Sequence, residues 1–253
     1  MDNNSKNKKF LIIFLRSFFI QAVWNFKSML SIGWTFTLSP FAKKLYGDKK
    51  HYQDFLNRHL SFFNAHPYFA SYALGAIARL EEDSVNVENY DHEQIEKFKN
   101  AIIGPLGAIG DQLFWANIKP ASIMVGYLGV LIFPELFQKL IFLCIFLILY
   151  NIPHIYMRYF GIIRGYNEGL SIYRKLRIES FSRWQKVYSL IGALAFSIVI
   201  AYLIDKSVQH DLIEVPMFAM SFGVAYFLRS RKRMTYLPVF IPLLIAIVLG
   251  ILI

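Results

Sequence analysis

The sequence contains a single cysteine, Cys144, and it lies within an apolar run. One thiol provides neither a disulfide framework nor a cysteine-based metal site, and a buried thiol behaves as a small hydrophobic group. The six histidines are scattered, and no pair has metal-ligand spacing with a nearby carboxylate. The chain also has no GxSxG sequence, Walker loop or dinucleotide fingerprint. We therefore expect no metal, no cofactor and no catalytic residue in this chain alone.

Charged residues are also scarce, at 17% of the 253 residues, whereas 56% are hydrophobic and 24 are phenylalanine. This balance is too apolar for an ordinary soluble domain and is typical of a membrane protein with several spans. The formal net charge is +10. In such a protein a basic excess usually marks cytoplasmic loops beside anionic membrane lipid, and no nucleic-acid-binding module is present.

Apolar runs predict the membrane spans. Leu140–Met157, Val187–Ile204 and Met234–Ile253 are long enough to cross as single helices. Ala121–Phe133 and Val215–Leu228 are shorter, so they would need tilt or local thinning of the bilayer.

Charge asymmetry predicts the orientation of these spans. Residues 158–186 carry seven basic and two acidic side chains, which indicates a cytoplasmic loop. The next loop, DKSVQHDLIE, is acidic, and RSRKR returns the chain to the cytoplasm, so the N-terminus is expected inside and the C-terminus outside. The basic start followed by an apolar run is similar to a secretion signal. Arg16 and Gln21 interrupt that run, so we expect the segment to be retained.

The first half is more irregular, and we divide the chain accordingly. Residues 1–135 are predicted to form amphipathic N-terminal helices and broken membrane segments, and residues 136–253 to form anchor helices. The expected fold is an all-α polytopic membrane protein with broken or re-entrant helical segments in the first half. Gln21, Asn25 and Ser28 would share one face of a helix, which either lines a polar cavity or meets water and headgroups.

The segment Leu60–Leu80 is apolar on average but carries Asn64, His66 and Pro67 near its start. The residue before a proline is pushed away from helical geometry, so we expect an extended or kinked entry. Broken backbone is tolerated in membranes only where protein or a water-filled cavity surrounds it. His66 has three possible roles: a ligand contact, a structural hydrogen bond or proton transfer.

The sequence IGPLGAIGDQLFWANIKP places glycine at every third position, at Gly104, Gly107 and Gly110. On a helix this spacing forms a ridge that another backbone can approach closely, while Pro105 predicts a break. Asp111 follows the ridge. A carboxylate at membrane depth is costly, so it either faces an interior polar site or caps the next helix at the membrane edge.

Together these segments resemble the IID membrane subunit of the mannose/fructose/sorbose family of the bacterial sugar phosphotransferase system. The likeness is distributed over residues 21–120 and fades from about Ser171. It is carried by QAVWNFKSMLSIGWTFTLSP, RHLSFFNAHPYFASYALGAIARLEE and KNAIIGPLGAIGDQLFWANIKP, with a weaker echo at Gly161, Gly165, Tyr166 and Gly169.

The resemblance implies a subunit that is not itself phosphorylated, in the bacterial cytoplasmic (inner) membrane. It would form a hetero-oligomer with a separate IIC chain and build the sugar pathway with it, while cytoplasmic IIA and IIB proteins carry the phosphoryl group. The candidate sugar contacts are Asn64, His66 and Asp111, followed by Gln21 and Asn25. The candidate backbone break is formed by Gly104, Pro105, Gly107 and Gly110.

Two departures from the family pattern are visible. Gly107 and Ala108 exchange the order of a small pair in that family's glycine-rich motif. After Gly169 the chain is strongly basic, where the family usually has a short acidic stretch. These departures leave open an alternative function, namely a IID-derived scaffold or regulatory protein that no longer transports sugar.

Overall fold

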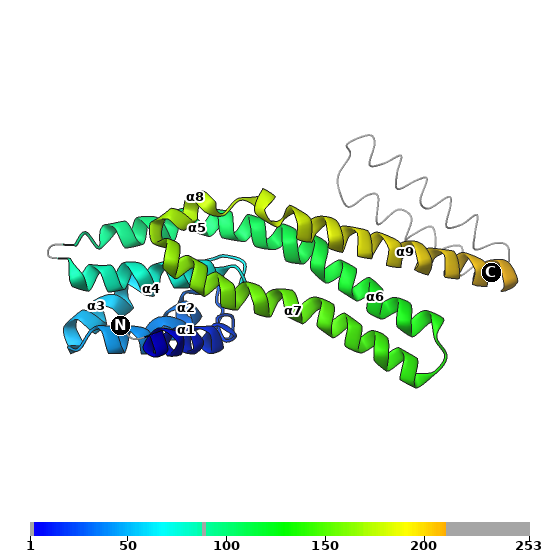
Figure 1. Ribbon diagram of the computed structural model, residues 1–253, viewed down its shortest axis with the longest axis horizontal. Coiled ribbons are helices and arrows are strands. Elements are labelled where there is room, and N and C mark those ends of the chain that lie inside the picture. Colours follow the sequence, from blue (N-terminus) through cyan, green and yellow to red (C-terminus); the bar gives the residue numbers. More distant parts are fainter. Residues whose placement is uncertain (1–2, 88–89, 211–253) are drawn as a thin grey trace. The chain divides into compact units, whose positions relative to one another are not determined.

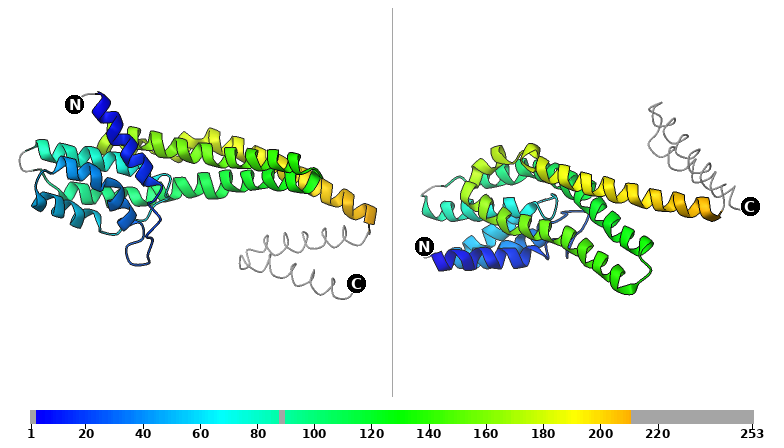
Figure 2. Two further views of the ribbon diagram at one scale, coloured as in Figure 1. Left: turned by 90° about the horizontal axis from the view of Figure 1, so that it is seen from below. Right: turned by 45° about the vertical axis from the view of Figure 1, so that its right-hand side comes forward.

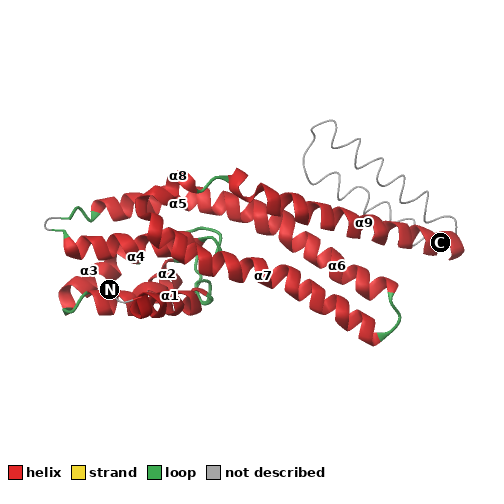
Figure 3. Ribbon diagram, in the orientation of Figure 1, coloured by secondary structure: helices red, strands yellow, loops and turns green. Residues whose placement is uncertain are grey.

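The computed structural model describes residues 3–87 and 90–210, and this part of the chain is helical without any strand (Figures 1 and 3). Its β-type pairing is limited to isolated bridges that join Met29 to Asn25 and to Phe63. The predicted all-α fold class is therefore confirmed. The elements are α1 (Asn3–Ser17), α2 (Ser31–Leu45), α3 (Lys49–His59), α4 (Ala70–Asn86), α5 (Glu93–Gly110), the π-helix η1 (Asp111–Ile118), α6 (Lys119–Ile132), α7 (Leu136–Glu168), the 3-10 helix η2 (Gly169–Ser171), α8 (Ile172–Lys175), the 3-10 helix η3 (Ile178–Phe181) and α9 (Ser182–His210).

Three helical stretches in the described residues are long and apolar enough to cross a membrane: Glu93–Ile132, Leu136–Lys175 and Ile178–Lys206. The predicted spans Leu140–Met157 and Val187–Ile204 lie inside α7 and α9. The first stretch has 40 residues, and α7 alone accounts for 33 residues of the second. At about 1.5 Å per residue these helices are roughly 60 Å and 50 Å long, so each extends well beyond the hydrocarbon core of about 30 Å.

Of the other predicted spans, one is part of a longer helix and two lie outside the described residues. The run 121–133 is not a separate short span, because all of it except Phe133 lies in α6, which continues α5 and η1. The runs 215–228 and 234–253 lie outside the described residues.

The chain divides into two compact units, Met1–Ala193 and Leu194–Ile253. The boundary expected at residue 135 falls in the short turn between α6 and α7, which run side by side in the first unit (Figure 2).

Glycines lie at the positions where α4 and α7 approach each other most closely. A Cβ on Gly75 would clash with the carbonyl of Ile162, and a Cβ on Gly165 would clash with the carbonyl of Tyr72. Gly161 faces the Ser71 hydroxyl and the Tyr72 ring in the same way. Side-chain-free ridges of this kind let helix backbones approach closely.

The cationic end of α7 is part of the helical bundle and not of a loop. Arg158 is only 3% exposed, and its Nη1 donates to the Ser17 carbonyl at 2.5 Å and to the Ser17 hydroxyl at 3.2 Å. The loop predicted over 158–186 therefore begins too early, because α7 continues to Glu168. Packing against α1 and α4 holds this last part of α7 in helical form, which a count of charges does not reveal.

Candidate functional site

Two irregular segments of the chain meet at His66 and Gly110. Residues 62–66 have no regular helix, and α4 begins only at Ala70, after Pro67. This confirms the extended entry that the proline predicted. A Cβ on Gly110 would clash with the His66 side chain. The absence of a side chain at this glycine therefore lets the histidine lie against the end of α5.

The imidazole of His66 is 2% exposed and lies in an aromatic pocket. Its ring stacks on Phe114 at 5.2 Å and 19° and lies 5.1 Å from the Trp115 ring. The backbone N–H of Tyr68 donates to His66 Nδ1 at 3.3 Å. A neutral imidazole that accepts at Nδ1 carries its proton on Nε2. Nε2 is buried and has no hydrogen-bond partner among the described residues, so it presents an unpaired donor.

Asn64 and Asp111 belong to the two segments that meet at this buried ring, and both are exposed. Asn64 is two residues before His66, and Asp111 follows Gly110 directly, so the structure brings the three predicted residues into one region. Asp111 is not buried within this chain, and its side chain does not cap the helix that follows.

The backbone break was predicted at Gly104, Pro105, Gly107 and Gly110, and of these four positions the helix changes its winding at the last one. The helix α5 continues through Pro105 to Gly110, where the winding widens into η1. Its buried stripe of Ile102, Leu106 and Ile109 holds it against the core on both sides of the proline. A Cβ on Gly104 or Gly107 would meet nothing within 4 Å, so that part of the glycine ridge is open in this chain.

The π-helix η1 carries polar groups on one side. The Lys119 N–H bonds to the Phe114 carbonyl, which is the i to i+5 pattern of the wider winding. Asn117 Nδ2 donates to the Gln112 carbonyl at 2.6 Å. An open hollow of about 500 Å³ lies between η1 and the first part of α9. It is lined by Gln112, Asn117, Gln185, Lys186, Ser189, Leu190 and Ala193.

Asn25 shapes a turn and does not line a helix face. Its Oδ1 accepts from the backbone N–H groups of Lys27 and Ser28 at 3.0 and 2.9 Å, and Met29 has a φ of 54°. The expected amphipathic helix through Gln21 and Asn25 is absent, because α1 ends at Ser17 and side-chain bonds of this type compete with helical bonding.

The turn nevertheless lies next to the site. Leu30 N–H donates to the Phe63 carbonyl at 2.9 Å, and Phe63 precedes Asn64. Gln21 is exposed earlier in the same connection, and the described part of the chain shows no bond from its side chain to Asn64, His66 or Asp111.

Lys99 fixes the start of the loop that carries Asn64. Its Nζ is buried and donates to the His59 carbonyl at 3.1 Å, the Ser61 carbonyl at 2.9 Å and the Ser61 hydroxyl at 2.8 Å. This residue is not among those predicted from the sequence. The available signal was its position on the apolar stripe of α5, between Ile95 and Ile102, where a lysine requires buried acceptors.

A second buried polar cluster surrounds Glu81, whose side chain has no exposed surface. Its carboxylate accepts from Tyr46 at 2.5 Å, Arg58 at 2.9 Å and His59 Nε2 at 2.7 Å. The Trp34 indole N–H lies 3.3 Å from His59 Nδ1 and can only donate, so His59 is neutral with its proton on Nε2.

Two pKa shifts agree with this assignment. Burial lowers the pKa of His59, which favours the neutral ring. Burial alone would raise the pKa of Glu81, but the hydrogen bond from His59 and the nearby Arg58 charge outweigh it and lower the pKa to about 2. The cluster therefore anchors α2, α3 and α4 to one another around a fixed carboxylate. Within the described residues, no group of three histidine, cysteine or acidic side chains is placed to hold a metal ion.

Comparisons with known proteins point to one family. The model of the PTS system mannose/fructose/sorbose family IID component matches residues 5–253. The mannose-specific EIID component of Escherichia coli K12 is 31% identical over 181 residues, which are 71% of this chain and 62% of that protein. The fructose permease IID component of Bacillus subtilis is 29% identical over 223 residues, which are 81% of this chain and 77% of that protein.

Solved structures show the same fold. The chain matches the cryo-EM structure of the mannose transporter ManYZ with microcin E492 at a TM-score of 0.59, with 24% identity over 96% of this chain and 94% of the other. A second structure, described as "Structure of membrane protein", matches at a TM-score of 0.71, with 22% identity over 96% and 95% of the two chains. The family match over residues 5–253 shows that this chain belongs to the IID components of the mannose/fructose/sorbose family of the phosphotransferase system.

Proposed function

We propose that this chain is the IID permease subunit of a sugar-transporting phosphotransferase complex and forms the translocation pathway with a IIC membrane partner. Cytoplasmic IIA and IIB proteins would supply the phosphoryl group, which makes uptake one-way. Family membership and the three candidate spans support this function. The observation that carries it is the meeting of the Asn64 loop with the α5–η1 junction around the unpaired Nε2–H of His66.

This arrangement suits a sugar, which requires donors and acceptors held at fixed positions. His66 offers a buried donor, Asn64 an amide and Asp111 a carboxylate. An exposed carboxylate on a membrane span is costly against lipid, so Asp111 requires either a partner chain or a wet cavity beside it. Gln112, the residue after Asp111, lines the hollow between η1 and α9, and Gln185 contributes a buried amide nitrogen without a hydrogen-bond partner among the described residues.

The proposed location is the bacterial inner membrane, with the N-terminus and the basic segment after α7 on the cytoplasmic side. Arg174, Lys175, Arg177 and Arg183 lie between the second and third candidate spans or at their ends, and all are exposed. The positive-inside rule places such a segment in the cytoplasm. The predicted external C-terminus depends on spans outside the described residues.

The test is phosphorylating uptake of radiolabelled hexoses and amino sugars in cells that carry the chain with its neighbouring genes. Deletion of this chain alone is expected to abolish uptake of one sugar. Asp111→Asn is expected to reduce that uptake about tenfold or more, because a hydrogen bond to a charged group is replaced by a neutral one. Membrane insertion should remain unchanged.

Asp54→Asn is the matched control, because Asp54 is an exposed acid on α3. Uptake at the wild-type level in both variants would show that the Asp111 carboxylate is not part of the sugar pathway. If deletion affects no sugar although the wild-type protein is present in the membrane, the permease function is wrong and the scaffold or regulatory alternative replaces it.

A further inference from the structure

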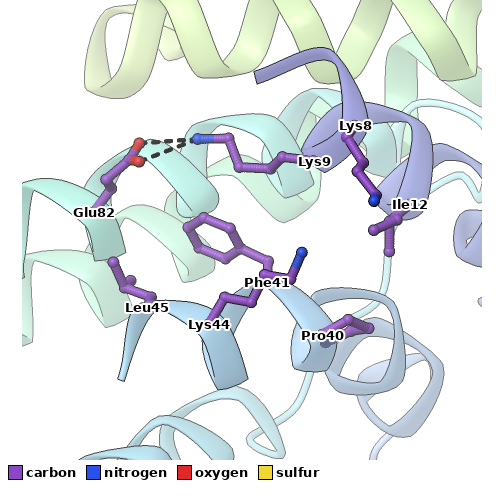
Figure 4. A pocket seen from close by; sticks show the side chains of 8 residues that line it. All are labelled: Lys8, Lys9, Ile12, Pro40, Phe41, Lys44, Leu45 and Glu82. Carbon is purple, nitrogen blue, oxygen red and sulfur yellow. Dashed lines mark hydrogen bonds and ion pairs between the residues drawn. The ribbon is translucent and has the colours of Figure 1, made fainter. Parts of the chain in front are cut away.

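A hollow of about 170 Å³ lies between α1 and α2 (Figure 4), and none of the residues that line it belongs to the Asn64–Asp111 site. Apolar side chains from both helices form its floor, and cationic groups stand at its rim. It is lined by Lys8, Lys9, Ile12, Pro40, Phe41, Lys44, Leu45 and Glu82. A site of this composition suits a ligand that is anionic at one end and apolar at the other.

The charges at the rim are not balanced. Lys9 Nζ is held by both oxygens of Glu82, at 3.2 and 3.1 Å, and lies 4.2 Å from the Tyr166 ring centre. Lys8 and Lys44 are exposed, and in Figure 4 their ammonium groups turn toward the gap between the helices. Among the described residues, no carboxylate lies within ion-pair distance of Lys8 or Lys44. Two uncompensated positive charges therefore face the same hollow.

The two helices that form the hollow also carry exposed apolar side chains. Leu11 and Leu15 of α1 are 48% and 54% exposed, and Phe36 of α2 is 41% exposed. The Phe36 ring also lies near Phe19, with ring centres 6.3 Å apart. Lysines beside exposed leucine and phenylalanine are typical of helices that lie at the boundary between lipid headgroups and acyl chains.

The hollow also lies at the end of the unit that carries the basic segment. Glu82 at its rim accepts a hydrogen bond from Tyr166, near the C-terminal end of α7, and Lys175 follows in α8. In the orientation proposed above, this end faces the cytoplasmic leaflet, where anionic lipids gather. Lipid therefore supplies the one abundant ligand that has both an anionic group and an apolar body at this position.

We propose that this hollow binds an anionic phospholipid. Its phosphate would lie between Lys8 and Lys44, and the first methylenes of an acyl chain would cover Ile12, Phe41 and Leu45. The proposal rests on the proposed cytoplasmic orientation and is independent of the sugar pathway. Its success or failure therefore leaves the transport function to be judged by uptake alone.

The test uses the full chain, purified with its membrane partner in neutral detergent, and a fluorescent phosphatidylglycerol as the probe. The wild-type protein is expected to bind it more tightly than the matching phosphatidylcholine. The double variant Lys8→Gln/Lys44→Gln should bind phosphatidylglycerol about 25-fold more weakly, because each lysine near an anionic headgroup contributes about fivefold. Lys49→Gln/Lys50→Gln, which removes two exposed lysines from the start of α3, should bind as the wild type does.

Several results would overturn the proposal. Equal loss in both double variants would show general charge attraction and no site. Displacement of the probe by inorganic phosphate alone would assign the hollow to a free anion. Lysine-dependent binding of an acidic cytoplasmic protein without a preference for phosphatidylglycerol would make it a protein-docking surface. Unchanged helical circular dichroism in both double variants keeps any loss of binding from being attributed to unfolding.

Discussion

Glu81 is a fully buried carboxylate, and its charge is stabilised by the hydrogen-bond donors and the cation that surround it. Transfer of a charge from water into a protein interior costs several kcal/mol, and the cost is offset where hydrogen bonds and an opposite charge are well placed. Tyr46, Arg58 and His59 supply these bonds from three directions. Loss of the negative charge would leave the largely buried Arg58 without its counter-ion.

Replacement of Glu81 by Gln is therefore expected to lower the free energy of unfolding by about 3 kcal/mol, the cost of breaking a buried ion pair. Glu93→Gln is the control, because the exposed pair of Glu93 with Lys97 contributes little. The measurement is the thermal unfolding midpoint in detergent, followed by tryptophan fluorescence. Equal unfolding midpoints for the two variants would mean that the negative charge of Glu81 does not stabilise the fold.

The same cluster sets a pH dependence. The pKa of Glu81 is lowered in the folded state to about 2, and that of His59 is lowered from 6.5, so the unfolded chain binds the extra protons. Stability is then expected to fall as the pH drops below about 6.5 for His59 and below about 4.5 for Glu81. Thermal unfolding midpoints measured from pH 7.5 downward should show this loss of stability in the wild type. The Glu81→Gln variant should lack the part of the loss that occurs below about pH 4.5.

At the residue scale, the structure follows from the sequence where the signal is local. Pro67 predicted the extended entry that exposes Asn64 and buries His66. The partners of Glu81 and Lys99 were missed because they are 22 to 40 residues away in the chain. A polar residue in an apolar stripe indicates that a partner is required, but it does not identify that partner.

At the scale of the elements, the glycines divide into two groups that the sequence alone does not separate. At Gly75, Gly161 and Gly165, atoms of a neighbouring helix occupy the space that a Cβ would need. At Gly104 and Gly107, a Cβ would meet no atom of this chain within 4 Å. Spacing predicted a ridge at Gly104, Gly107 and Gly110, of which Gly110 lies against the His66 side chain. The contact in the first group joins helices about 90 residues apart in sequence, so periodicity within either helix alone does not indicate it.

Gly75→Val is expected to destabilise the crossing of α4 and α7 by about 2 kcal/mol or more, because the added side chain meets backbone, which cannot rotate away. The readouts are the thermal midpoint and the yield of folded protein in detergent. Gly47→Val is the matched control, since a Cβ there meets nothing within 4 Å. A variant at Gly75 as stable as the control would contradict the close approach of these two helices.

At the scale of the whole molecule, the described part of the chain has surface that it does not cover itself. In the most apolar windows of the three candidate spans, only 17–22% of the residues are buried. Lipid suits most of this surface, but it does not suit the exposed carboxylate of Asp111 or the open glycine ridge before it. Close packing of a second membrane chain on that ridge would bury the glycines and provide polar surroundings for Asp111.

Gly107→Val tests this packing, because the chain itself leaves the position open. The variant is expected to fold with a midpoint near that of Gly47→Val but to co-purify with its IIC partner at least about tenfold less well, since small residues at such interfaces let helix backbones approach closely. Wild-type co-purification would show that the partner does not pack on this ridge. Asp111 would then face water or lipid, and its proposed place in a shared sugar pathway would lose its structural basis.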